Sequence, residues 1–198
     1  MIKAFLSLGL MLSLFSPALA QKQPQAVDID PQTGIHFPRV LGSLKRMGMK
    51  KFEKPELGLD CRYAGNPLPI ADIFIYDNGQ KDLGAGLNPA VRTHFQEVKN
   101  EIFLLQKAGY YRSVKQVSAG ESVLATPSKR LPVLSAIFTY SQPPAKGVAY
   151  TGVRTSHVLL TAYKGYFLKI QFTYPKDQEK RGKEALQQFL ADFGKVLK

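Results

Sequence analysis

Asp72 is the residue whose neighbours are most unusual for its type. In the strand expected over residues 70–76, it shares a face with Ile70, Phe74 and Tyr76, so a carboxylate stands among apolar side chains. A carboxylate in such a place lies either at the margin of the sheet or beside a partner that holds it. Catalysis would also need a second acid or base beside it, and the sequence does not nominate one. The pattern favours a structural ion pair between Asp72 and an Arg or Lys.

The three histidines, His36, His94 and His157, would carry most hydrolytic mechanisms. No two of them have metal-ligand spacing such as His-x-x-x-His, and the single cysteine, Cys61, excludes a zinc or iron–sulfur site built from several cysteines. Ser156 and His157 are neighbours in an expected strand, so their side chains point to opposite faces and are wrongly placed for a nucleophile and its base. We therefore predict no metal, no cofactor and no catalytic residue.

A glycine-containing loop, residues 84–86, precedes an expected helix start at Asn88 and Pro89. Helix N-termini attract anions, which raises the possibility of a phosphate-binding loop. However, the third glycine of a dinucleotide fingerprint is missing, and so is the Gly-Lys-Ser/Thr of a P-loop. We interpret the loop as a flexible connection.

Strands account for most of the elements that must position these residues. Alternation with a period of two predicts strands over residues 57–63, 70–76, 110–117 and 133–141, and a hairpin of 155–163 and 166–174 around Lys164-Gly165. Cys61 falls on an apolar strand face, where a thiol is inert packing. Residues 39–54 contain two glycines, and we expect a short strand or turn there, not a regular helix.

Two helices follow from apolar residues at three- and four-residue steps. Asn88 and Pro89 start the first, and Gly109 stops it. The second runs from about residue 178 to 197, with Asp177 as its cap and Glu179 paired with Lys183. Its buried stripe is Leu186, Phe189, Leu190, Phe193 and Leu197. Each stripe needs a sheet face, which predicts an α+β fold: a mainly antiparallel sheet with two long amphipathic helices packed on it.

A resemblance supports this fold class. The succession Phe37-Pro38, Leu44-Lys45-Arg46, 58–63 (GLDCRY), 71–77 (ADIFIYD) and 91–95 (VRTHF) resembles an uncharacterised family of exported bacterial proteins. The C-terminal strand–turn–strand, Tyr174-Pro175 and amphipathic helix are similar to the end of Mog1/PsbP-like α/β/α sandwich domains. The resemblance implies a fold and a compartment, and it carries no activity across.

The N-terminus is typical of a secretory signal peptide. A short basic start with Lys3, an apolar run and Ala18-Leu19-Ala20 predict cleavage near Ala20, and the apolar run is too short to span a bilayer. We expect a signal peptide over 1–20, a flexible tether over 21–34 and a single α+β domain over 35–198. The protein would be periplasmic or secreted, with no transmembrane span in its mature form.

The formal net charge of the full chain is +12. For an exported protein, this points to anionic partners such as lipid head groups or cell-wall polymers, although a basic surface can also serve solubility alone. No motif of a nucleic-acid-binding domain is present, so no nucleic-acid partner is expected. The charge is densest in residues 39–54, which hold one acid, Glu53, and six candidate anion contacts: Arg39, Lys45, Arg46, Lys50, Lys51 and Lys54.

Two functions remain open. The first is a non-enzymatic exported domain that binds or scaffolds at the cell envelope, with an anionic envelope component or an envelope protein as its partner. The alternative is an envelope-directed hydrolase that uses Asp72 with a distant histidine such as His94. The sequence favours the first.

Overall fold

The computed structural model describes residues 29–66, 68–80, 82–128, 130–145, 148 and 150–197. The predicted signal peptide, 1–20, and residues 21–28 of the predicted tether lie outside this part. The elements within it are β1 (Val40–Leu41), β2 (Leu44–Lys51), a 3-10 turn (Pro55–Leu57), β3 (Leu59–Ala64), β4 (Ile70–Tyr76), α1 (Pro89–Lys107), β5 (Arg112–Ala125), β6 (Arg130–Ser141), β7 (Arg154–Tyr163), β8 (Tyr166–Pro175), a second 3-10 turn (Lys176–Gln178) and α2 (Glu179–Val196).

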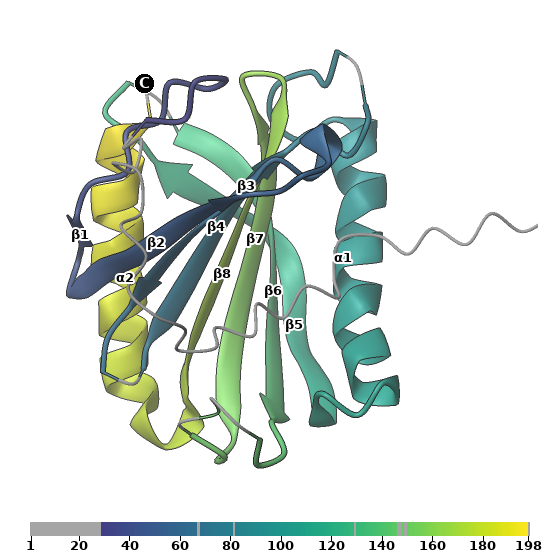
Figure 1. Ribbon diagram of the computed structural model, residues 1–198, viewed down its shortest axis with the longest axis vertical. Coiled ribbons are helices and arrows are strands. Elements are labelled where there is room, and N and C mark those ends of the chain that lie inside the picture. The colour runs from purple at the N-terminus through teal and green to yellow at the C-terminus, as the bar shows by residue number, and fades with distance from the viewer. Residues whose placement is uncertain are drawn as a thin grey trace, which may run out of the picture.

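The strands of the described part form one antiparallel sheet of eight, in the order β1-β2-β3-β4-β8-β7-β6-β5 (Figure 1). Strands β1 to β4 pair with their neighbours in the chain, as do β5 to β8, and the two sets join where β4 pairs with β8. This confirms the α+β class and the antiparallel sheet. It also places the predicted hairpin of β7 and β8 in the middle of the sheet.

One helix packs on each face of the sheet. Phe189 of α2 shares a buried cluster with Ile170 and Phe172 of β8, whereas Phe95 of α1 shares a second cluster with Phe167 of β8. Alternate residues of β8 therefore point to opposite helices, as the period of a strand requires. We call the two sides the α1 face and the α2 face. The terminal helix therefore packs on the sheet face that carries Ile170 and Phe172.

The two helices differ in how they begin. The Asn88 side chain accepts a hydrogen bond from the Val91 N–H at 2.9 Å, and Pro89 opens α1, as predicted. The prediction that Asp177 caps α2 is wrong. Asp177 lies within the 3-10 turn, the N-cap residue is Gln178, and no side chain caps the helix. The Asp177 carboxylate instead accepts a hydrogen bond from the Tyr150 hydroxyl at 3.2 Å.

Strand β5 is longer than predicted and begins later, covering Arg112–Ala125 in place of residues 110–117. It is an edge strand that pairs only with β6 in the described part. Nearly all of its side chains are exposed, so no apolar alternation marks its second half.

Residues 29–34, at the end of the predicted tether, form a turn against the rest of the fold. Asp30 and Thr33 are buried, and the Asp30 carboxylate accepts a hydrogen bond from the Thr33 N–H at 2.8 Å. The Lys164 ammonium, in the turn between β7 and β8, donates to the Thr33 carbonyl at 2.9 Å. After the turn, Ile35 and Phe37 are buried in the core on the α2 face.

Within the described residues, no helix combines the length and the apolar composition needed to cross a membrane.

Candidate functional site

The basic segment, residues 39–54, forms one edge of the sheet (Figure 1). It folds into β1 and β2 as the glycines indicated, without a helix. Five of its cationic residues are exposed: Arg39, Lys45, Lys50, Lys51 and Lys54. Arg46 is half-buried, and its guanidinium donates to the Phe37 carbonyl oxygen. Arg46 therefore supports the fold as well as adding charge.

Strand pairing divides these cations between the two faces of the sheet. Lys50 lies opposite Asp60, which points to the α1 face, whereas Lys51 lies opposite Leu59, a member of the core on the α2 face. Residues directly opposite each other in an antiparallel pair share a face. The cations of the basic segment therefore do not gather on one face of the sheet. They lie together along its outer edge.

Apolar side chains accompany the cations at this edge. Strand β1 covers only the start of β2, pairing Leu41 with Leu44 and Val40 with Lys45. Met47 follows at an irregularity of the β2–β3 register, and 63% of it is exposed. Val40 is 51% exposed. The edge thus presents cations of both faces around two exposed apolar groups.

A row of three charged residues and one Phe crosses the α1 face beside this edge. Lys50, Asp60, Phe74 and Lys169 stand opposite one another on β2, β3, β4 and β8. Lys50 thereby links the basic segment to the interior of the sheet.

Asp72 forms an ion pair with Arg62 in the next row of the α1 face. The Nε–Oδ1 distance is 2.6 Å and the Nη2–Oδ2 distance is 3.1 Å, so both carboxylate oxygens are engaged. The structural ion pair expected for Asp72 is present.

Asp60 and Lys169 are titratable groups that sequence reasoning passed over. Both are more than nine-tenths buried, and Oδ1 of Asp60 has no hydrogen-bond partner among the residues that the structure describes. Burial, followed by the charge of Asp72, raises the pKa of Asp60 to about 7, and burial lowers the pKa of Lys169. The signal was available, because each is a charged residue between two apolar strand residues, as Asp72 is.

The raised pKa of Asp60 lies in the range of acid–base catalysis, but access argues against that role. Asp60 is 7% exposed and Lys169 is 6% exposed, so a substrate atom has almost no path to either. The Lys169 ammonium lies 4.3 Å from the centre of the Phe74 ring, a cation–π contact that partly replaces water. Asp60 and Lys169 are thus packed as residues of the protein interior are, and not as residues of an open active site.

Two of the three histidines, His94 and His157, have hydrogen-bond partners away from Asp72. His94 is buried between α1 and the sheet, with Nε2 2.8 Å from the Tyr76 hydroxyl and Nδ1 2.7 Å from the Glu97 carboxylate. His157 faces the other way, with Nε2 3.0 Å from the Tyr174 hydroxyl. Burial lowers the pKa of both imidazoles, to about 4 for His157. In the described part, no histidine hydrogen-bonds to Asp72, and a hydrolase built on such a pair stays a prediction without a contact in its favour.

Ser156 and His157 point to opposite faces, as the strand period required. The Ser156 hydroxyl lies 3.0 Å from that of Thr173 on the α1 face. Cys61 is fully buried, and burial raises the pKa of its thiol to about 12, in line with inert packing. The 84–86 loop is fastened to β7, because Gly86 and Ala162 exchange two backbone hydrogen bonds of 3.0 and 3.3 Å.

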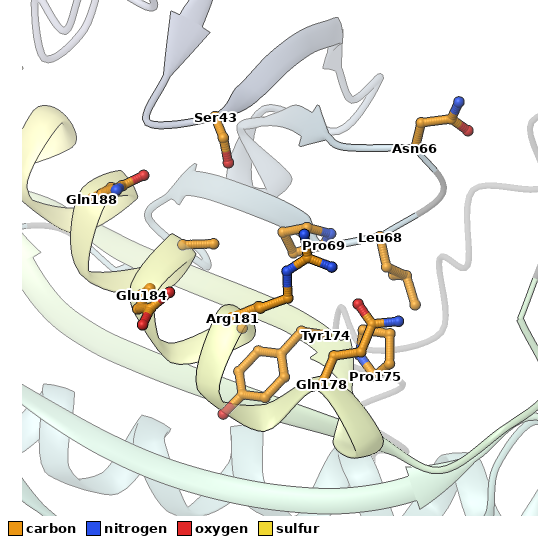
Figure 2. A pocket seen from close by; sticks show the side chains of 12 residues that line it. Ser43, Asn66, Leu68, Pro69, Tyr174, Pro175, Gln178, Arg181, Glu184 and Gln188 are labelled. Carbon is orange, nitrogen blue, oxygen red and sulfur yellow. The ribbon is translucent and has the colours of Figure 1, made fainter.

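A cavity of about 400 Å³ opens beside α2 on the α2 face (Figure 2). Its wall is assembled from the β1–β2 turn, the β3–β4 turn, the end of β8 and the first half of α2. The lining residues include Ser43, Leu68, Tyr174, Gln178, Arg181 and Glu184. Sequence reasoning missed this cavity, because its lining residues come from segments more than 100 positions apart.

A comparison of the chain with models of known protein families finds no match, and a comparison with curated protein sequences finds none either.

Proposed function

We propose that the protein is a non-enzymatic exported domain that attaches reversibly to an anionic surface of the cell envelope. The observation that carries this proposal is the exposed edge formed by β1 and β2, which carries five exposed cations together with the exposed side chains of Met47 and Val40. Charge draws such an edge to an anionic surface, and the apolar side chains add contact once it arrives.

The geometry supports an edge-on approach. Cations of the α1 face and of the α2 face both border β2, so a flat approach by either face would leave part of the charge turned away. An edge-on approach brings both sets to the surface together. It also directs Met47, at the register irregularity, toward the membrane interface.

The expected attachment is weak. Each Lys or Arg near an anionic leaflet contributes on the order of 1 kcal/mol, and this attraction fades within a Debye length of about 8–10 Å. The five exposed cations are offset by one exposed acid, Glu53. Binding is therefore reversible by salt and serves for localisation, not permanent anchoring.

The same proposal includes the export of the protein and the type of its fold. The signal-peptide pattern of residues 1–20 supports secretion to the periplasm or beyond. A sheet with one helix on each face, ending in the β7–β8 hairpin and α2, supports a Mog1/PsbP-like α/β/α sandwich.

Sedimentation with vesicles that contain an anionic lipid tests the proposal. In the edge variant, Arg39, Lys45, Lys51 and Lys54 are changed to Gln, because these exposed side chains make no ion pair in the described part of the chain. Arg46 and Lys50 stay, since both have contacts that serve the fold. The control variant changes Arg112, Lys107, Lys115 and Lys180 to Gln, which removes the same charge from other exposed sites.

We expect the edge variant to lose most vesicle binding while the control variant keeps it. Equal loss in the two variants would show that only net charge matters. Unchanged binding by the edge variant would contradict the proposal. The edge lysines would then have another role that such residues are known to play, which is to block edge-to-edge strand pairing.

A further inference from the structure

We infer that the cavity beside α2 is a second binding site, which takes a short peptide by its C-terminal carboxylate. This site lies on the α2 face and shares the β1–β2 turn, through Ser43, with the edge that forms the proposed envelope contact. The geometry of the cavity, the cation in it and the uncharged groups around it support this assignment.

Arg181 supplies the charge for a carboxylate. Figure 2 shows its guanidinium near the centre of the cavity, above the ring of Tyr174. With the residues that the structure describes, this guanidinium forms no ion pair and no hydrogen bond. The N–H groups of such a guanidinium can donate two parallel hydrogen bonds to the two oxygens of a carboxylate.

The rim offers groups that match peptide amides. Ser43, Asn66, Gln178 and Gln188 line the cavity, and their side chains form no hydrogen bond with the described residues. Asn66 and Gln188 stand at opposite ends of the cavity in Figure 2. Side-chain amides and hydroxyls can donate to a peptide carbonyl or accept from a peptide N–H.

Glu184 gives the site a second charge of opposite sign. It lies three residues after Arg181 on α2 and lines the same cavity. Side chains three apart on a helix start about 5–6 Å from each other. An extended dipeptide is about 7 Å long, so its carboxylate can meet Arg181 while its ammonium lies near Glu184.

The floor is apolar and rigid. Tyr174 and Pro175 are buried, and the Tyr174 hydroxyl is held 3.0 Å from Nε2 of His157. Leu68 and Ala185 add apolar surface at the sides. A cavity of about 400 Å³ with an apolar floor and a few polar groups fits a ligand of dipeptide size.

Amide NMR spectra of the full chain, titrated with L-alanyl-L-alanine and with the same dipeptide as its C-terminal amide, test this inference. We expect the free acid to bind in the millimolar range and the amide about tenfold more weakly. The shifted signals should be those of Arg181, Gly182 and Ala185, which line the cavity.

Two matched variants assign the effect to one side chain. Arg181→Gln should reduce binding of the free acid to the level of the amide. Lys180→Gln removes the same charge from the neighbouring exposed residue, which does not line the cavity, and should leave binding unchanged. Equal binding of acid and amide, equal losses in the two variants, or no shifts at about 20 mM dipeptide, a range far above a millimolar dissociation constant, would overturn the inference.

Discussion

Gly182 of α2 lies against the ring of Tyr174 on β8 so closely that a Cβ at position 182 would come 2.2 Å from Cδ2 of the ring. The helix therefore reaches β8 only because this position has no side chain. The same contact forms the floor of the cavity, since both residues line it.

Gly182→Ala should destabilise the protein. In an open helix, Gly→Ala is favourable by roughly 1 kcal/mol, but here the added methyl must displace a buried ring, and overpacking costs about 1–3 kcal/mol. Urea unfolding measures the difference. Gly120→Ala is the control, because a Cβ there meets nothing within 4 Å. A Gly182→Ala protein at least as stable as the parent would contradict the packing described here.

Phe189→Ala should cost about 3–5 kcal/mol, the usual range for a buried Phe. Phe189 is fully buried, and its ring contacts those of Tyr63 and Phe172 at centroid distances of 5.9 and 5.5 Å. Leu104→Ala on α1 provides the comparison, because Leu104 is 53% exposed and should change stability little. Similar urea midpoints for the two variants would show that the α2 register is wrong.

Asp60→Asn should change how stability depends on pH. The pKa of Asp60 rises from 3.8 to about 7 in the folded protein, chiefly by burial. Between about pH 4 and pH 7, the folded state holds a proton that the unfolded chain releases, so the contribution of Asp60 is full below that window and is lost as pH rises through it. An Asn side chain does not titrate, so the variant does not lose this contribution to the free energy of unfolding.

The free energy of unfolding of Asp60→Asn, relative to the parent, should therefore increase by on the order of 2–4 kcal/mol from pH 4 to pH 8. Urea unfolding at several pH values provides the measurement. Asp82→Asn, at an exposed loop position, should give a curve parallel to that of the parent. A parallel curve for Asp60→Asn would show that Asp60 is ionised throughout this range.

Elements with a regular apolar pattern were predictable from the sequence. Strand β4 was expected over residues 70–76 and has these bounds, and α1 begins at the Asn88 cap and Pro89 as expected. Strand β5 was predicted only as far as residue 117, because the exposed side chains of its second half show no apolar alternation. The Asp177 cap was wrong because a 3-10 turn inserts Lys176–Gln178 before the helix.

The candidate sites were less predictable, because they depend on which residues lie side by side. Lys50 and Lys51 are neighbours in the sequence, yet strand pairing sends them to opposite faces. Asp60 and Lys169 are 109 positions apart and come together only through the pairing of both with Phe74. Local patterns carry no information about such register, whereas the partner expected for Asp72 followed from its burial alone.

The most direct test of the envelope contact is whether Met47 enters an anionic membrane. Cys61 is fully buried and the pKa of its thiol is about 12, so a thiol introduced at position 47 can be labelled selectively with an environment-sensitive fluorophore. Val117→Cys is the control. Val117 is 62% exposed, close to the 63% of Met47, but it lies on β5 at the opposite edge of the sheet. We predict a blue shift of the label at position 47 with anionic vesicles, no shift at position 117, and reversal in about 0.5 M salt, where the Debye length is only about 4 Å. Equal responses at the two positions, or a shift at position 47 that salt does not reverse, would contradict the proposed edge-on electrostatic attachment.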